Sequence, residues 1–409
     1  MSELNNIPKH WQVKKLGEVC DKISLNKIKI KQKDYLSAGK FPVIDQGQDL
    51  IGGYFNDESL LVPSEPPYII FGDHTKIKKF VNFRFVPGAD GVKVLKPHSC
   101  FDPKFFFYLI HTVKIPDKGY ARHFQFLEKE DIPIPPLSEQ LAIVSKIEEL
   151  LSDLENGKQQ LLTAQQQLKV YRQSLLKAAF EGKLTSTLSS ASLREQKEGE
   201  LPEGWKWVTI ADLAENNKHA LKAGPFGSAL KKEFYVETGY KIYGQEQVII
   251  DNPYFGDYFI DEEKYQELKS CRIKPFDILI SLVGTVGKVL ILPENCMDGI
   301  INPRLIKISL NRQKYLPKFF KYYFESSSVK AHYKSQAQGT TMDVLNLGII
   351  KKIPFPLTTL EEQQKVVDEL ESKLTVCDKI EETIAQSLLQ AEALKQSILK
   401  NAFEGKLLN

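Results

Sequence analysis

The sequence predicts an α+β fold in which two globular α/β domains are joined by two long antiparallel coiled-coil helices, as a pseudo-twofold internal repeat. Three observations support this prediction. The chain of 409 residues repeats several of its own motifs at a fixed offset. Each repeat contains a long apolar stripe with heptad spacing, which is typical of a coiled coil. Each stripe follows a region of short β-like runs separated by turn residues.

The closing motif of each repeat is the clearest duplicated segment. Residues 171–184 end in Ala-Ala-Phe-Glu-Gly-Lys-Leu, and residues 394–407 end in Asn-Ala-Phe-Glu-Gly-Lys-Leu, at an offset of 223. At the same offset, Glu139-Gln140 corresponds to Glu362-Gln363. Because such self-similarity marks a repeated architecture, the chain is predicted to contain the same structural unit twice.

These matches divide the chain into five parts. Both globular regions open with a Pro-x-x-Trp pattern, which ends at Trp11 and Trp205. A segment rich in Ser and in charged residues separates the two halves and predicts a linker. The predicted parts are a globular domain (1–135), a helical region (136–184), the linker (185–200), a second globular domain (201–352) and a second helical region (353–409).

The helical regions show their period directly. Apolar or small residues recur at steps of four and three over 143–178, and the stripe returns over 366–401 with polar interruptions. The first helix, predicted from Ser138 to Glu181, spans about 65 Å at 1.5 Å per residue. Gly182 and Gly405 are predicted stops. A helix this long with one apolar stripe needs a partner, and the second copy supplies it as an antiparallel pair.

Further apolar residues lie beside the heptad stripe. They are predicted to cover either the globular domains or a partner protein, and the sequence leaves both alternatives open. These residues are Val144, Leu151, Leu162, Leu176, Val367, Leu374 and Leu388.

The globular regions contain β-like runs between turns rich in Gly, Pro and Asn. Each also has an aromatic segment after a proline, at 103–110 and 317–324, which predicts a short helix packed on a sheet. The aromatic side chains could instead stack on nucleic-acid bases, but a core role is the preferred interpretation. The predicted strands are Tyr68–Phe71, Val92–Leu95, Asp277–Ser281, Val289–Leu292 and Leu305–Ile308.

The charge is unevenly distributed along the chain. The two globular regions each carry a net charge of +4, whereas residues 136–200 carry −1 and residues 353–409 carry −4. Mildly basic domains between acidic connectors are expected of two surfaces that face a polyanion, although chance variation is the alternative at such small values.

Composition limits the cellular context. The five cysteines are far apart and form no Cys-x-x-Cys pair, which argues against disulfides and zinc. No apolar run is long enough to span a membrane, and the first residues do not read as a secretory signal. We therefore expect a reduced, cytoplasmic protein.

The duplicated motifs resemble those of the specificity subunits of bacterial and archaeal type I restriction–modification systems. The resemblance rests on Ile-Pro-x-Pro followed by Glu-Gln, on the long helix and on the closing Phe-Glu-Gly-Lys-Leu, each present twice. Gly224–Ser228 and Asp277–Ser281 also resemble segments of the family's recognition domains. The resemblance covers essentially the whole chain. It implies two target-recognition domains alternating with two conserved helical regions.

The resemblance also implies a function and partners. The domain interiors scarcely align, which in this family implies two different DNA half-sites and hence a bipartite, asymmetric target. The expected partners are double-stranded DNA, two modification (methyltransferase) subunits and restriction subunits. The chain itself is expected to hold no cofactor, with S-adenosylmethionine, ATP and Mg²⁺ on the partner subunits.

Two motifs bear a weak resemblance to catalytic or nucleotide-binding sequences. Asp251-Asn-Pro-Tyr-Phe255 lacks the second proline of an adenine-methyltransferase motif and is interpreted as a turn. Gly284-Thr-Val-Gly-Lys288 lacks the spacing of a phosphate-binding loop. The seven histidines show no metal-ligand spacing. The sequence thus predicts a non-catalytic subunit, the alternatives being an unseen methyltransferase or nuclease, a coiled-coil DNA-binding scaffold, or a specificity subunit of a related system.

Basic and polar side chains are the candidates for DNA contact, since Lys and Arg position a protein on phosphates and Gln can bond adenine in bidentate fashion. For any single residue a solvated charged surface is the alternative. The candidates are Lys76, Lys78, Lys79, Arg84, Arg122 and His123 in the first domain, and Lys231, Lys232, Arg272, Lys274, Lys288, Arg304, Lys334, Gln336 and Gln338 in the second.

Overall fold

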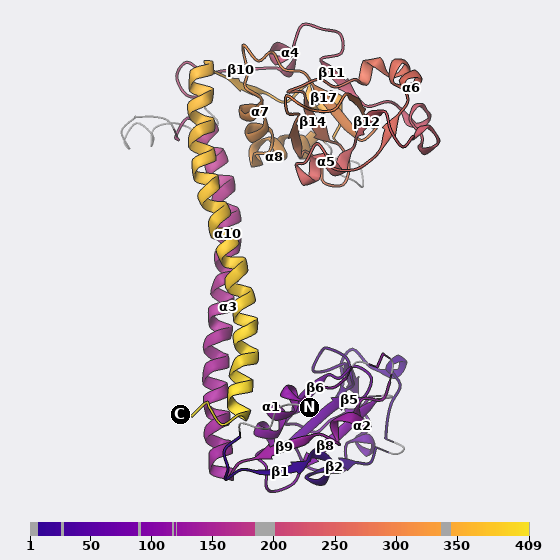
Figure 1. Cartoon of the computed structure of the whole chain (residues 1–409), viewed down its shortest axis with the longest axis vertical. Coiled ribbons are helices and arrows are strands. Elements are labelled where there is room, and N and C mark those ends of the chain that lie inside the picture. The colour runs from indigo at the N-terminus through magenta and orange to yellow at the C-terminus, as the bar shows by residue number, and fades with distance from the viewer. Residues whose placement is uncertain are drawn as a thin grey trace. The chain divides into compact units, whose positions relative to one another are not determined.

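The chain folds into two compact units, residues 1–163 with 384–409 and residues 164–383. The computed structural model describes residues 7–25, 28–88, 91–116, 118–119, 121–184, 201–336 and 345–408. Each unit contains one globular domain and a part of each long helix (Figure 1). The helices are α3 (Leu137–Phe180) and α10 (Leu360–Phe403), each of 44 residues. The predicted α+β fold with two domains and two long helices is confirmed.

Domain 1, residues 7–134, is built around a four-stranded antiparallel sheet with the order β2-β8-β5-β6. A smaller three-stranded sheet has the order β4-β3-β7, in which β3 and β7 are parallel. Its elements are β1 (Gln12–Lys15), β2 (Cys20–Ile23), β3 (Phe41–Ile44), β4 (Gly53–Phe55), β5 (Tyr68–Gly72), β6 (Lys78–Val81), β7 (Val86–Pro87), β8 (Val92–Pro97), α1 (Pro103–Thr112), α2 (Phe124–Leu127) and β9 (Asp131–Ile134).

Domain 2, residues 201–357, has the same strand topology. Its sheets have the orders β11-β17-β14-β15 and β13-β12-β16, and β12 and β16 are parallel. Its elements are β10 (Lys206–Val208), α4 (Ile210–Leu213), β11 (Leu221–Ala223), β12 (Tyr240–Tyr243), α5 (Gln245–Ile250), β13 (Phe259–Ile260), α6 (Glu262–Glu267), β14 (Ile278–Ser281), β15 (Val289–Ile291), β16 (Gly299–Ile301), β17 (Leu305–Ile308), α7 (Pro317–Phe324), α8 (Ser327–Gln336), α9 (Leu347–Ile350) and β18 (Phe355–Leu357). The five strands predicted from the sequence are confirmed as β5, β8, β14, β15 and β17.

The aromatic segments form helices α1 and α7, as predicted, and their rings belong to the core. Phe105, Phe106, Phe319 and Phe320 are fully buried. Pro103 and Pro317 occupy the first turn of each helix, where the missing N–H costs nothing. These aromatic side chains are therefore structural, and the stacking alternative is wrong for the buried rings.

Each long helix ends on the domain of the unit that contains its last turn. The ring of Phe403 lies 5.2 Å from that of Phe105 in domain 1, and the ring of Phe180 lies 5.1 Å from that of Phe319 in domain 2. After each Phe the chain turns through a left-handed glycine, Gly182 or Gly405. The closing motif is thus duplicated because it packs on equivalent helices of two different domains.

The apolar residues beside the heptad stripe cover the globular domains. Val144 and Leu151 pack with the core of domain 1. Leu176, Val367 and Leu374 pack with the core of domain 2. The alternative that the sequence left open is resolved for these five residues, whereas Leu162 and Leu388 are only partly buried. The predicted linker 185–200 lies outside the described residues, and the remaining predicted domain boundaries stay predictions.

Candidate nucleic-acid interface

In domain 1 the turn between β5 and β6 has a shape fixed by its backbone. Gly72 donates its N–H to the carbonyl oxygen of Ile77 and accepts the N–H of Lys76, each at 2.8 Å. Lys76 has a φ of 59°, the left-handed conformation that closes such a turn. The turn therefore presents a basic side chain from a rigid loop.

Asp73 joins this turn to residues 121–124. Its side chain is buried, and one carboxylate oxygen accepts the N–H of Phe124 at 2.8 Å while the other lies 3.3 Å from Lys93 Nζ. Its carbonyl oxygen accepts the backbone N–H of His123 at 2.8 Å and lies 3.0 Å from the ring Nδ1 of the same residue. The structure thus brings the predicted residues around Lys76 together with those around Arg122.

Not all predicted residues of domain 1 face solvent. The His123 ring is fully buried and Lys79 is 5 % exposed, so both support the loop from inside. Lys79 Nζ donates to the carbonyl oxygens of Asp45 and Asp49. Arg84 is exposed but lies near Tyr68, at the opposite end of β5 from the turn.

Lys78 is partly buried beside the turn. Burial and, to a lesser extent, the charge of Lys76 together lower the pKa of its ammonium group to about 8. Placing two lysines this close costs energy in the absence of an anion, because each charge disfavours the other. A phosphate beside the pair would favour the charged form of both lysines.

Domain 2 repeats the basic turn with different side chains. The turn between β14 and β15 ends at Lys288, whose N–H donates to Ser281 Oγ at 3.0 Å. Helix α8 packs behind it and contributes Lys330 and the exposed Lys334. Burial lowers the pKa of Lys330, Glu325 raises it, and the nearby Lys288 and Lys334 lower it again. Two of the predicted residues, Lys288 and Lys334, therefore lie in one basic cluster.

A second exposed loop of domain 2 carries Arg304. Its neighbour Asn302 lies against Gly224, so closely that a Cβ at Gly224 would clash with the Asn302 carbonyl. Gly224 begins the segment in which Phe226 is 90 % exposed. The two loops place a cation and an aromatic ring on adjacent backbone segments, a combination that suits nucleic acid.

The other predicted residues are more dispersed. Lys231 pairs with Glu233 at 3.3 Å, and Lys274 pairs with Glu215. The Arg272 guanidinium stacks 4.0 Å from the Tyr265 ring. Lys232 is exposed, Gln336 is the last residue of α8, and Gln338 lies outside the described residues.

Sequence reasoning missed two glutamines that hold the basic turns. Gln46 accepts the N–H of His74 through Oε1 at 3.2 Å, and its carbonyl oxygen accepts Thr75 Oγ1 at 2.8 Å. In domain 2 the Nε2 of Gln245 donates to the carbonyl oxygen of Val283. Both glutamines follow a strand of the smaller sheet closely, and that shared position was the signal that could have revealed them.

The described residues contain no group of three or more His, Cys, Asp or Glu side chains placed to hold a metal ion. Within the same ranges, no helix is long and apolar enough to cross a membrane. The segment around Asn252 forms a turn, as predicted.

Comparison with known proteins gives a consistent family. The family described as "Type I restriction modification DNA specificity domain" matches residues 8–164 and 202–390. The specificity subunit of the type I restriction enzyme EcoBI from Escherichia coli is 27% identical over 282 residues, which is 68% of this chain and 58% of the relative. The corresponding subunit of EcoDI, also from Escherichia coli, is 23% identical over 431 residues, 98% of this chain and 89% of the relative.

The chain therefore spans less than two thirds of the length of EcoBI's subunit. A solved structure described as "Structural basis underlying complex assembly and conformational transition of the type I R-M system" contains a chain with a TM-score of 0.69 to this one. The two are 18% identical, and the match covers 98% of this chain and 99% of the other. At 18% sequence identity, this structural similarity shows a shared fold.

Proposed function

The chain belongs to the type I restriction–modification DNA specificity family, and on that premise we propose that it recognises the DNA sequence on which such a system acts. The observation that carries the proposal is the repeated basic turn. Domains of one topology present Lys76 with Arg122 in one case and Lys288 with Lys334 in the other. The same strand connection thus faces the polyanion with different side chains.

The target of this recognition is bipartite and asymmetric. Equivalent turns occupy the same place in the two folds, but one is backed by residues 121–124 and the other by α8. Because bases are read by the side chains that reach the groove, two unlike sets of side chains select two unlike half-sites.

The partners are two modification subunits and the restriction subunits, and the long helices are their docking surface. Some apolar side chains of these helices are not buried against the globular domains and remain exposed. Among them are Val170 at 70 %, Val376 at 55 % and Leu389 at 73 %. Helix α10 carries a net charge of −4 and helix α3 a net charge of zero, and exposed apolar side chains on helices without a basic excess fit protein contacts better than DNA contacts. The repeated helices suit two copies of one partner.

Catalysis belongs to those partners. This chain acts as a non-catalytic subunit, and S-adenosylmethionine, ATP and Mg²⁺ are held by the modification and restriction subunits. The purified chain alone is therefore expected to show neither methyltransferase nor nuclease activity.

The decisive experiment is to map methylated adenines in a host that expresses this chain with its modification subunit. The expected result is a motif of two unlike half-sites separated by unspecified bases. Exchange of residues 201–352 for another family member's domain should change one half-site and leave the other. A palindromic or continuous motif, or equal affinity for random and selected duplexes at one stated salt concentration, would refute the proposal.

A further inference from the structure

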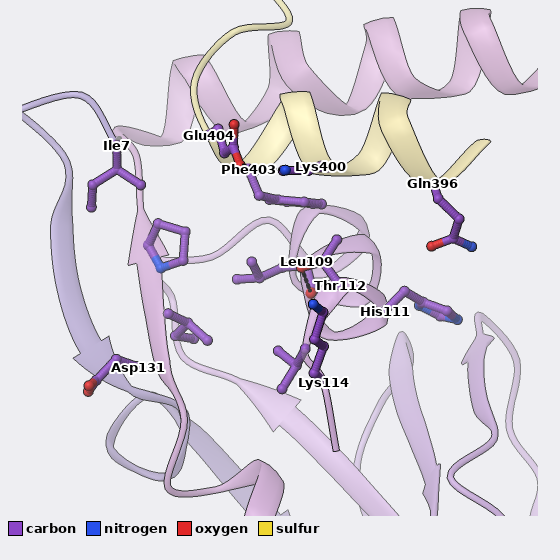
Figure 2. A pocket seen from close by; sticks show the side chains of 13 residues that line it. Ile7, Leu109, His111, Thr112, Lys114, Asp131, Gln396, Lys400, Phe403 and Glu404 are labelled. Carbon is purple, nitrogen blue, oxygen red and sulfur yellow. Dashed lines mark hydrogen bonds and ion pairs between the residues drawn. The ribbon is translucent and has the colours of Figure 1, made fainter. Parts of the chain in front are cut away.

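A pocket of about 670 Å³ lies in the first unit, where the end of α10 meets α1 and β9 (Figure 2). Its floor is apolar and includes Leu109, Ile132 and Phe403. Polar side chains from α1, the segment after it and α10 surround the floor; His111, Lys114 and Lys400 are among them. We call this feature the open groove.

The second unit contains the repeat-related copy of this groove. Lys177, Phe180 and Glu181 line it, and at the repeat offset of 223 they correspond to Lys400, Phe403 and Glu404 of the open groove. Ile353-Pro354 takes the place of Ile132-Pro133. The copy has a volume of only about 220 Å³, so the two sites differ in what fills them.

Two features fill the copy in the second unit. Tyr323 stands where domain 1 has Leu109, and its hydroxyl donates to the carbonyl oxygen of Pro354 at 2.7 Å. Helix α8 then lays Val329 into the site, where it is 1 % exposed. In the first unit the residues that follow α1, Val113–Pro116, form no helix. Among the residues that the structure describes, the open groove therefore contains no counterpart of helix α8.

The surroundings of the open groove are basic. Lys114 and Lys395 are exposed. The pKa of His111 is lowered, mainly by burial, and the charge of the nearby Lys395 also lowers it. The two groove carboxylates are already paired, Asp131 with Lys15 at 3.5 Å and Glu404 with both Lys406 and the rim residue Lys400. An occupant therefore meets an apolar floor beside the exposed cations Lys114 and Lys395.

We propose that the open groove receives one amphipathic helix of the modification subunit, with an apolar side chain in the place of Val329 and carboxylates facing Lys114 and Lys395. The intramolecular copy shows that this shape accepts a helix, and burying apolar area in a preformed groove is a common mode of helix recognition. This inference rests on the proposed function, since that function supplies the partner. Because the copy in the second unit is closed, only one of the two modification subunits uses such a groove, in addition to the docking surface that the long helices offer to both.

The test is a titration of the full chain with the purified modification subunit. Leu109→Tyr copies the side chain that closes the second groove and should weaken binding at least tenfold. Leu109→Met keeps the volume of the groove and should stay within twofold of the wild type. Lys114→Glu places a negative charge opposite the helix's carboxylates and should weaken binding about fivefold, whereas Lys114→Gln should have a smaller effect.

The outcomes separate the two proposals. If the wild-type chain forms no complex with the modification subunit, the proposed function fails. If the wild type binds and both Leu109→Tyr and Lys114→Glu bind within twofold of it, the groove inference is overturned. Should Leu109→Tyr fail to fold, as circular dichroism would show, the exposed Lys114 variants decide the question alone.

Discussion

Gln140 and Gln363, 223 residues apart, make the same three hydrogen bonds in domains whose sequences scarcely align. Gln140 Oε1 accepts the N–H of Asp102, and its Nε2 donates to the carbonyl oxygens of Cys100 and Pro135, at 2.8 to 2.9 Å. Gln363 makes the equivalent bonds to Leu316, Lys314 and Thr358, also at 2.8 to 2.9 Å. Both side chains are fully buried. Each glutamine therefore fastens a long helix to the start of the domain helix, α1 or α7.

Replacing either glutamine by alanine should destabilise its own unit. Gln140→Ala leaves one N–H and two carbonyl groups without these partners, and each unsatisfied buried group costs about 1–3 kcal/mol. Part of this cost is recovered if water enters. We expect a net loss of about 2–4 kcal/mol, measured by urea denaturation followed by tryptophan fluorescence.

The control for this prediction is Gln160→Ala, an exposed position on the same helix. It should change stability by less than about 0.5 kcal/mol. Equal losses for Gln140→Ala and Gln160→Ala would show that the three hydrogen bonds contribute nothing.

The glycines of the long helices should respond to alanine in opposite directions. Gly405 has a φ of 72°, and a Cβ there would clash with the ring of Pro8. Gly405→Ala should therefore destabilise the first unit by more than the roughly 1–2 kcal/mol that a left-handed conformation alone costs an L-residue. Gly157, in the middle of α3, has open space around its Cβ position, so Gly157→Ala should stabilise the helix by about 0.5–1 kcal/mol. Thermal unfolding of both variants checks the sign, and a stabilising Gly405→Ala would contradict the role of a left-handed glycine at the end of α10.

The repeated architecture could be predicted from the sequence because the duplicated residues have repeated structural duties. Phe403 and Gly405 must fit domain 1 as Phe180 and Gly182 fit domain 2, so the motif recurs. The strand topology shared by the two domains could not be predicted. Many different apolar sequences can form the same sheet, because its buried positions require only that the side chains be apolar and of suitable size.

The candidate site was predicted less completely for a physical reason. The sequence alone does not show whether the ammonium group of a lysine faces water or buried carbonyl oxygens. Lys79 lies on a strand next to Lys78, and alternation sends one inward to Asp45 and Asp49. The glutamines Gln46 and Gln245 were missed because their role depends on a turn that is distant in sequence.

Removing one exposed cation from each domain should weaken DNA binding additively. Arg122 and Lys288 are exposed members of the two basic clusters. If each contacts a phosphate, each alanine variant reduces the slope of log K against log salt by about 0.9, and the double variant by about twice that. Fluorescence anisotropy over a salt series measures the slope. His123→Ala serves as the comparison: it should lower stability, because its ring is buried, without the loss of one phosphate contact.

The charge of Lys78 should make DNA binding depend on pH between 7 and 9. Burial and the charge of Lys76 lower its pKa from 10.5 to about 8, so the ammonium group is mostly charged at pH 7 and mostly neutral at pH 9. Affinity for a duplex at fixed salt should therefore fall as the pH rises through this window. Stability should move in the opposite direction: the folded state bears the cost of the buried charge below pH 8, and that cost is relieved as the pH rises from 8 towards 10.5. Lys78→Arg keeps its charge throughout, so it should bind with little change between pH 7 and 9, and a wild-type affinity that is equally flat would show that Lys78 does not face DNA.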